Sequence, residues 1–344
     1  MEIMNDKKTT MLKWLNSKDS TVIRLVFLLI GVFIFCAILK PRLFLSSNNF
    51  VSISKQFPEL GILALGISIA MISGGIDLSG VSIANLSSVL SAFFLIKQVS
   101  SPAGAEHPLL FILLTVALSL CIGCVCGGIN GFLIAVINIP PILATLGSSL
   151  LYTGIAIVIT GGKTISGLPL LYSRIGNSSL FSVIPVPLIL FAAVAAFSFF
   201  ILEKTKFGKE LYLAGTNMKA AFYSGVQTVS LLIKTYALAG ILAACSGLIM
   251  MARYNSTKAD QGSSYTMQCI LIAVLGGVNP NGGKGSVLGI VLAVIILQFL
   301  STTLNMFENL SNFYRDIIWG LILIAVLVSN YFINQIETKK YEKQ

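Results

Sequence analysis

Apolar runs long enough to cross a lipid bilayer recur along almost the whole chain. A bilayer-crossing helix needs about 20 mostly apolar residues. By this criterion we expect ten segments, at 22–39, 58–73, 81–96, 108–136, 141–160, 183–202, 229–252, 266–278, 285–306 and 314–333. The predicted fold is therefore an all-α integral membrane protein with about ten transmembrane helices.

The composition supports the same conclusion. Of 344 residues, 56% are hydrophobic and only 10% are charged, whereas soluble globular domains carry roughly 25% charged residues. This balance excludes a soluble globular enzyme, an intrinsically disordered chain and a disulfide-rich secreted module.

The net charge of +10 comes from basic residues that lie between the apolar runs. This placement indicates membrane orientation, not nucleic-acid binding. We expect a basic cytoplasmic leader at 1–21, a transmembrane domain at 22–333 and a cytoplasmic tail at 334–344. With both termini cytoplasmic, 13 Lys and Arg residues fall inside and nine outside, and Lys234 within a span is interpreted as a snorkelling side chain.

Two of the ten runs, 58–73 and 266–278, are short and end at pairs of glycines. Short apolar runs of this kind are typical of broken or re-entrant helices, whose exposed backbone must be buried in protein or line a wet cavity. The sequences after them, Gly74-Gly75-Ile76-Asp77 and Gly276-Gly277-Val278-Asn279, resemble each other at a spacing of 202 residues. This match is the basis for expecting a two-half internal repeat.

The longest interior polar segment, 203–228, has the signals of a short capped helix. Gly215-Thr216-Asn217 predicts a turn, with Asn217 as the N-cap of a helix over Met218–Ser224, and Gly225 is a candidate C-cap.

This predicted helix has Ala220, Ala221 and Phe222 available for burial. Two interpretations of segment 203–228 remain open at this point. It either docks onto a soluble cytoplasmic partner or is a solvated connector that covers the end of the bundle.

No residues in the sequence argue for catalysis. Gly162-Lys163-Thr164 matches the end of a phosphate-binding loop, but Ile157 replaces its first glycine, so we read a turn at a membrane exit. Cys121-x-x-Cys124-x-Cys126 could suggest a metal site, yet His107 is the single histidine of the chain, and we interpret these cysteines as small packing residues. We therefore predict no catalytic residue, no metal and no cofactor bound by this chain.

Other residues within the spans predict packing and polar contacts. Gly123-x-x-x-Gly127-x-x-x-Gly131 and Gly285-x-x-x-Gly289 each place glycines on one helical face, which favours close helix packing. Asp77, between two spans, is expected to act as a cap or in gating, with a proton or cation site as the alternative.

Several motifs together resemble the permease subunits of bacterial ATP-binding-cassette (ABC) importers of the ribose, xylose and autoinducer-2 class. The resemblance covers nearly the whole chain. The matching stretches are Gly74-Gly75-Ile76-Asp77-Leu78-Ser79, Gly128-Ile129-Asn130-Gly131, Ile139-Pro140-Pro141-Ile142-Leu143-Ala144-Thr145-Leu146-Gly147, Thr160-Gly161-Gly162, Phe207-Gly208, Gly215-Thr216-Asn217, Ala220-Ala221, Ser224-Gly225-Val226, Val274-Leu275-Gly276-Gly277 and Gly282-Gly283-x-Gly285.

The resemblance implies a permease in the bacterial inner membrane that carries a small sugar or sugar-like solute. Its partners would be a cytoplasmic ABC ATPase that uses ATP and Mg, an extracytoplasmic solute-binding protein, a second permease copy or paralogue, and membrane lipid. The residues it implies for ATPase docking are Gly215, Asn217, Ala220, Ala221 and Gly225. Those it implies for the translocation path or its hinges are Gly74, Gly75, Asp77, Asn130, Gly276, Gly277 and Asn279.

The chain departs from the family pattern in two places. It reads Gly80-Val81-Ser82 where the family usually has Val-Gly-Ser, and Tyr265-Thr266-Met267-Gln268 where the family usually has an acidic stretch. The alternative function is a secondary transporter driven by an ion gradient, with Asp77 or Lys234 as the coupling charge and no ATPase.

Overall fold

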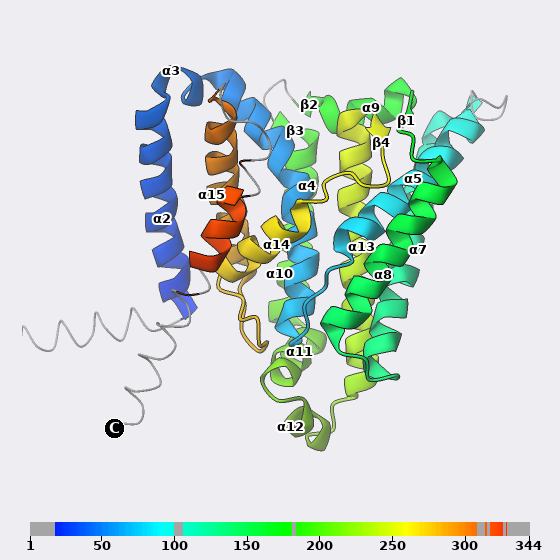
Figure 1. Cartoon of the computed structure of the whole chain (residues 1–344), viewed down its shortest axis with the longest axis vertical. Helices are drawn as coiled ribbons and strands as arrows, with labels where there is room; N and C mark the ends of the chain where they lie inside the picture. Colours follow the sequence, from blue (N-terminus) through cyan, green and yellow to red (C-terminus); the bar gives the residue numbers. More distant parts are fainter. Residues whose placement is uncertain are drawn as a thin grey trace, which may run out of the picture.

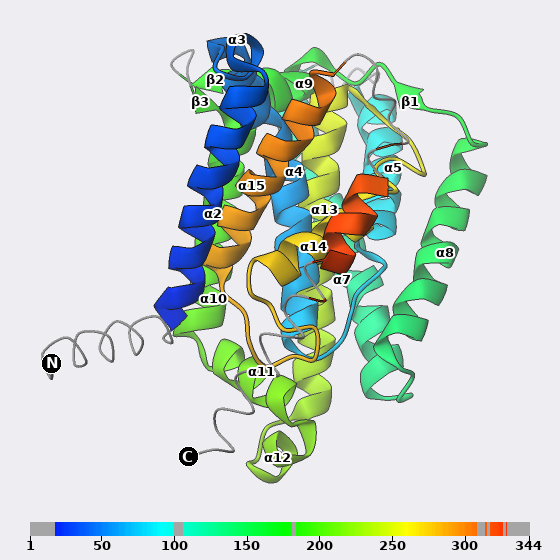
Figure 2. The ribbon, with the colours of Figure 1, turned by 60° about the vertical axis from the view of Figure 1, so that its left-hand side comes forward.

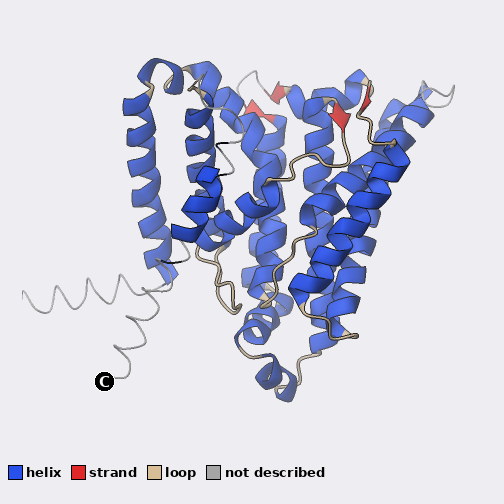
Figure 3. Cartoon of the chain, in the orientation of Figure 1, coloured by secondary structure: helices blue, strands red, loops and turns tan. Residues whose placement is uncertain are grey.

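The computed structural model describes residues 18–99, 106–180, 184–307, 314, 317–325 and 328, and shows a bundle of helices with two small strand pairs (Figure 1; Figure 3). The helices are α2 Lys18–Leu39, α3 Pro41–Phe44, α4 Ser47–Ile72, α5 Gly80–Val99, α7 Pro108–Ala135, α8 Pro141–Thr160, α9 Leu170–Asn177, α10 Val186–Lys204, α11 Lys206–Thr216, α12 Met218–Tyr223, α13 Thr228–Tyr254, α14 Tyr265–Leu275 and α15 Val287–Asn305. The strands are β1 Ile165–Ser166, β2 Ser179–Leu180, β3 Ile184–Pro185 and β4 Ser256–Thr257.

Eight of the described helices are long and apolar enough to cross a membrane: α2, α4, α5, α7, α8, α10, α13 and α15. They run between two ends of the bundle. The α12 end carries α11 and α12, and the α3 end carries α3, α9 and all four strands (Figure 1). At the α3 end, β1 pairs antiparallel with β4, which joins loops distant in the chain, and β2 pairs antiparallel with the nearby β3.

The centre of the bundle is formed by α4, α5 and α13, whose apolar stretches are mostly buried, whereas α2 lies at the periphery. The predicted glycine face packs there. A Cβ at Gly127 would meet the backbone of Tyr236, and one at Gly123 would meet the backbone of Gly240, so α7 and α13 approach with no side chain between them. The packing prediction is therefore confirmed for the face on α7. Gly289 of α15 likewise faces the backbone of Gly276, but Gly285 precedes α15 and does not share its helical face.

The peripheral helix α2 is attached through aromatic rings. Phe33 lies 5.5 Å from the ring of Phe44 and 5.8 Å from that of Phe299, and Phe44 meets Phe299 edge-on at 5.6 Å. These contacts fix α2 and α3 against α15 and add to the area that the rings bury.

The prediction that 58–73 is a short run was wrong. Helix α4 begins at Ser47 and has 26 residues, with Pro58 inside it. Its first three turns carry Ser52, Lys55 and Gln56, which lower the hydropathy and hide the helix from a search for apolar runs.

The short run 266–278 corresponds to a short helix, α14, of 11 residues. At 1.5 Å per residue it is about 16 Å long, roughly half of a bilayer core. The chain descends from β4 to mid-height without helix, and α14 continues toward the α12 end (Figure 2). On the other side of the bundle, segment 73–79 rises from the end of α4 to mid-height, where α5 begins (Figure 1).

Helices α4 and α14 end in the same hydrogen-bonded motif at the two glycine pairs. After α4, Gly74 donates to Met71 O and Gly75 to Ala70 O; after α14, Gly277 donates to Val274 O and Val278 to Ala273 O. The left-handed residues are Gly74 (φ +91°) and Gly277 (φ +87°), and only glycine adopts this conformation without strain. The equivalent positions are thus 203 residues apart, one more than the sequence match suggests.

The predicted leader 1–21 and tail 334–344 lie outside the described residues except for the start of α2. The predicted span 314–333 is described only at 314, 317–325 and 328, which are helical.

Candidate functional site

Three segments that are remote in sequence meet at the α12 end, and we call this place the junction. They are the turn after α4, helix α11, and the turn 276–286 that connects α14 to α15. The amide of Gly283 donates to Ile72 O at 2.9 Å, and the hydroxyl of Tyr212 donates to Gly285 O at 3.1 Å. The junction therefore ties α11 to the segment that leads into the short crossing of α5 and to the turn that follows the short helix α14.

Gly215 lies inside this junction, in the last turn of α11. A Cβ at this position would collide with Ile72 O and with the amide nitrogen of Gly283. The sequence predicted a turn at Gly215, but Lys206–Thr216 is helical. Glycine is required here because two backbone segments approach the helix closely. No pattern in the neighbouring sequence indicates this approach.

Tyr212 is the polar side chain that links α11 to the turn before α15. Burial, with a smaller effect from the charge of Glu203, raises the pKa of Tyr212 to about 12. Its hydroxyl therefore stays protonated at physiological pH and remains a donor to Gly285 O.

Helix α12 follows directly and has the predicted caps. The Asn217 side chain accepts from the amide of Ala220 at 3.0 Å. At the other end Gly225 (φ +83°) donates to Phe222 O and Val226 to Ala221 O. The capped helix is confirmed, with α12 ending at Tyr223.

The predicted burial on α12 was only partly right. Ala221 is fully buried, but Ala220 is exposed and Phe222 is 63% exposed. The neighbouring Tyr223 is 86% exposed, so two aromatic rings project from the end of the bundle, and sequence analysis missed them as surface residues.

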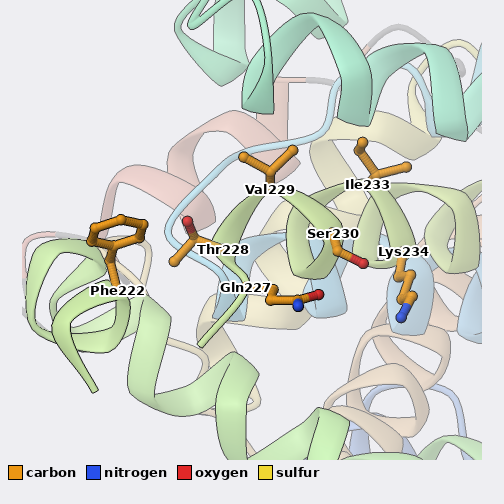
Figure 4. A pocket seen from close by; sticks show the side chains of 7 residues that line it. All are labelled: Phe222, Gln227, Thr228, Val229, Ser230, Ile233 and Lys234. Atoms are coloured by element: carbon orange, nitrogen blue, oxygen red, sulfur yellow. The ribbon is translucent and has the colours of Figure 1, made fainter. Parts of the chain in front are cut away.

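A groove of about 520 Å³ lies between α12 and the first turns of α13. Figure 4 shows Phe222 on one side and the α13 residues on the other. Its lining residues are Phe222, Gln227, Thr228, Val229, Ser230, Ile233 and Lys234. Lys234 is exposed at the α12 end of α13, the position expected of a snorkelling lysine.

Asp77 is buried in the non-helical segment before α5. Its Oδ1 accepts from the Ser79 amide at 2.8 Å and from the Ser79 hydroxyl at 2.6 Å. Asn130 donates to the same hydroxyl at 2.7 Å. Asp77 therefore closes a turn with Ser79, the residue before α5, within a network that joins this segment to α7.

Thr145 of α8 holds the rest of this segment. Its Oγ1 accepts from the amide of Leu78 at 3.1 Å and lies 3.1 Å from Ile76 O. The backbone groups between α4 and α5 have no intrahelical hydrogen bonds. The Thr145 side chain supplies hydrogen-bond partners for two of them inside the bundle.

The other residues expected along the path lie at turns of the α12 end. Gly74 and Gly277 are exposed, Gly75 and Gly276 are buried, and Asn279 accepts from the amide of Asn281 within the turn. The structure brings Gly74 close to Asn281 and Gly282, whereas Asp77 and Asn130 belong to the separate network of α5 and α7.

Sequence analysis did not predict a polar cavity of about 320 Å³ among α4, α13, α14 and α15. It is lined by Gln56, Leu60, Arg253, Tyr254, Ser264, Tyr265, Gln268, Gln298, Ser301 and Asn305. A signal was present, since Glu59 is an acidic residue in an otherwise apolar run, and such residues are rare and usually functional.

The fold and the site define a multi-pass α-helical membrane protein whose broken crossings meet a capped surface helix. The chain belongs to the family of permease components of branched-chain amino acid transport systems, whose model matches residues 49–327.

Among its relatives, the ribose import permease of Bacillus subtilis (strain 168) is 34% identical, over 87% of this chain and 90% of its own. The autoinducer 2 import system permease LsrD of Photorhabdus temperata is 31% identical, over 88% of this chain and 89% of its own. LsrC of Yersinia pestis (strain Pestoides F) is 31% identical, over 92% and 86%. No solved structure matches the chain.

Membership confirms the function expected from the motifs. The chain is a permease subunit of an ABC importer in the inner membrane, a membrane component and not itself an enzyme. An ATPase and a solute-binding protein are the partners that this class of permease implies. The alternative of a secondary transporter driven by an ion gradient is not supported.

Proposed function

We propose that this permease forms the translocation path for a small sugar or sugar-like solute, with the α12 end in the cytoplasm and a partner ATPase seated on α12. The termini would then also be cytoplasmic. The solute class follows that named for relatives, which import ribose or autoinducer 2. A second permease copy or paralogue would complete the pore.

The observation that carries this proposal is the junction. Movement of α11 and α12 would pull on Gly283 and Gly285 through backbone and tyrosine contacts, and the Gly283 amide is bonded to the last residue of α4. Closure of the ATPase pair on ATP binding would thereby displace segment 73–79 before α5 and the turn 276–286 after α14. Alternating access requires an element that can switch between two discrete arrangements. The packed, hydrogen-bonded junction is the element that we assign to this role.

The docking surface proposed is formed by Asn217, Ala220, Phe222, Tyr223 and Gly225. Exposed aromatic rings are typical anchors of protein interfaces, and those of Phe222 and Tyr223 lie 5.8 Å apart. Ala221 and Gly215 face inward and would transmit force instead of touching the ATPase.

A co-purification experiment tests the docking surface. We expect the double substitution Phe222→Ala and Tyr223→Ala to reduce the ATPase recovered with the tagged permease at least tenfold. Val158→Ala is the control, because Val158 is 82% exposed on α8 and lies outside the proposed surface. Equal recovery with both variants would show that the ATPase docks elsewhere.

A further inference from the structure

The polar cavity among α4, α13, α14 and α15 is lined mainly by groups that both donate and accept hydrogen bonds. Four lining residues are amides, Gln56, Gln268, Gln298 and Asn305, and the hydroxyls of two serines and two tyrosines complete the polar lining besides Arg253. Amides and hydroxyls suit sugar hydroxyls, which also donate and accept. Its volume of about 320 Å³ lies at the lower end of the range of about 300–1,000 Å³ for small-molecule sites.

The charge of the cavity is balanced. Among the described residues, Arg253 is the only charged one that lines the cavity. Its Nη2 lies 2.8 Å from Oε1 of Glu59, whose side chain is 1% exposed. A buried charge without a partner is costly, so this pair leaves little net charge to attract an ionic solute.

Glu59 also organises the wall of the cavity. The same Oε1 accepts from the hydroxyls of Tyr265 at 2.9 Å and Tyr254 at 3.3 Å. One carboxylate of α4 therefore orients three lining residues, from the end of α13 and the start of α14.

The side chains behind the wall include two buried polar atoms without partners among the described residues. Within the described part of the chain, Arg253 Nε and Glu59 Oε2 are buried without a hydrogen-bond partner. Leaving such groups unsatisfied costs free energy, but both atoms lie behind the cavity surface and do not face a ligand in the cavity.

We infer that this cavity binds an uncharged, hydroxyl-rich small molecule on the α3 side of the translocation path, with Glu59 as a positioning residue. The inference rests on the proposed function, because the cavity would be where the solute is held after its release by the binding protein.

The test is a binding experiment on the full chain in lipid nanodiscs, without any partner. The probes are a panel of uncharged pentoses and hexoses that includes D-ribose, with D-ribose 5-phosphate as the charged comparison. The variants are Gln268→Leu and Asn305→Leu, which remove cavity amides while keeping a similar side-chain size. Asn48→Leu is the matched control, because Asn48 is exposed near the start of α4 and does not line the cavity.

We expect an uncharged sugar to bind to the wild-type chain and to Asn48→Leu, with affinity at least tenfold lower in both cavity variants. The phosphorylated sugar is expected to bind at least tenfold more weakly than the neutral one. The inference is overturned if no sugar of the panel binds, if the cavity variants bind like the control, or if the phosphorylated sugar binds equally well.

ATP-dependent uptake by liposomes that contain the permease, ATPase and binding protein separates this inference from the proposed function. Uptake that is normal in wild type and in both cavity variants would overturn the cavity while leaving the importer mechanism in place. Sugar binding that depends on the cavity amides, together with uptake that does not require ATP, would support the cavity and contradict the proposed function.

Discussion

The amide of Gly283 donates a hydrogen bond to the carbonyl of Ile72, at 2.9 Å across 211 residues of sequence. Ile72 is the last residue of α4, and its carbonyl belongs to the group that a helix leaves unpaired at its C-terminus. The turn before α15 thus completes the end of α4. This bond makes the two glycine-terminated segments one mechanical unit, against which α11 packs.

Gly215→Ala tests this unit directly. The added Cβ would meet the backbones of Ile72 and Gly283, which cannot move aside as a flexible side chain could. We expect the ATPase to remain bound but uptake to fall at least tenfold. Gly154→Ala is the control, because nothing lies within 4 Å of a Cβ there; normal uptake by Gly215→Ala would show that the junction tolerates displacement.

Tyr212→Phe removes a single hydroxyl from the junction. The loss of its bond to Gly285 O is expected to destabilise the chain by about 1 kcal/mol and to lower the uptake obtained per ATP hydrolysed. Because the pKa of Tyr212 is raised to about 12, wild-type coupling should not change between pH 6 and pH 9 through this group. Tyr314→Phe, altered at a 53% exposed residue outside the junction and the docking surface, is the comparison, and equal coupling ratios for the two variants would contradict the assigned role.

Asn217→Ala removes the N-cap of α12. The bond from the Ala220 amide is lost, and caps of this kind contribute about 1 kcal/mol. We expect fraying of α12 and a several-fold weaker recovery of the ATPase, with recovery restored by Asn217→Asp, which can also cap. If Asn217→Ala and Asn217→Asp recover the ATPase equally well, the cap has no part in docking.

Asp77→Asn distinguishes a structural hydrogen-bond acceptor from an ion-coupling residue. The amide oxygen of Asn can accept from the Ser79 amide as Oδ1 of Asp77 does, so ATP-driven uptake should stay within about twofold. Asp77→Ala has no acceptor and is expected to lower thermal stability and uptake together. A complete loss of transport by Asp77→Asn at normal expression would show that the charge itself is needed.

Gly127→Ala tests the close contact between α7 and α13. Its Cβ would overlap the backbone of Tyr236, whereas a Cβ at the adjacent Gly128 meets nothing within 4 Å. We therefore expect a clearly lower melting temperature for Gly127→Ala in detergent and almost none of this effect for Gly128→Ala. A shift of equal size in the two variants would mean that α7 and α13 do not pack as described.

The sequence by itself determined the features that depend on near neighbours in the chain. Long apolar runs predicted the crossings 108–136 and 141–160 within a residue of α7 and α8, because a helix in lipid must satisfy its backbone internally. The caps Asn217 and Gly225 were also predicted from the sequence, because each bonds to a group three residues away in the chain.

Tertiary structure alone decided the features that join distant residues. The contact of Glu59 with Arg253 spans 194 residues. No local sequence pattern indicates the cavity beside this contact, and none indicates why position 215 must be glycine. The two glycine pairs are equivalent with a shift of one residue, because Gly74, the first of its pair, and Gly277, the second of its pair, take the left-handed conformation. The sequence could not show this, since either glycine of a pair can adopt that conformation. Periodicity and propensity act within a helix, whereas these choices depend on which backbone arrives from another part of the chain.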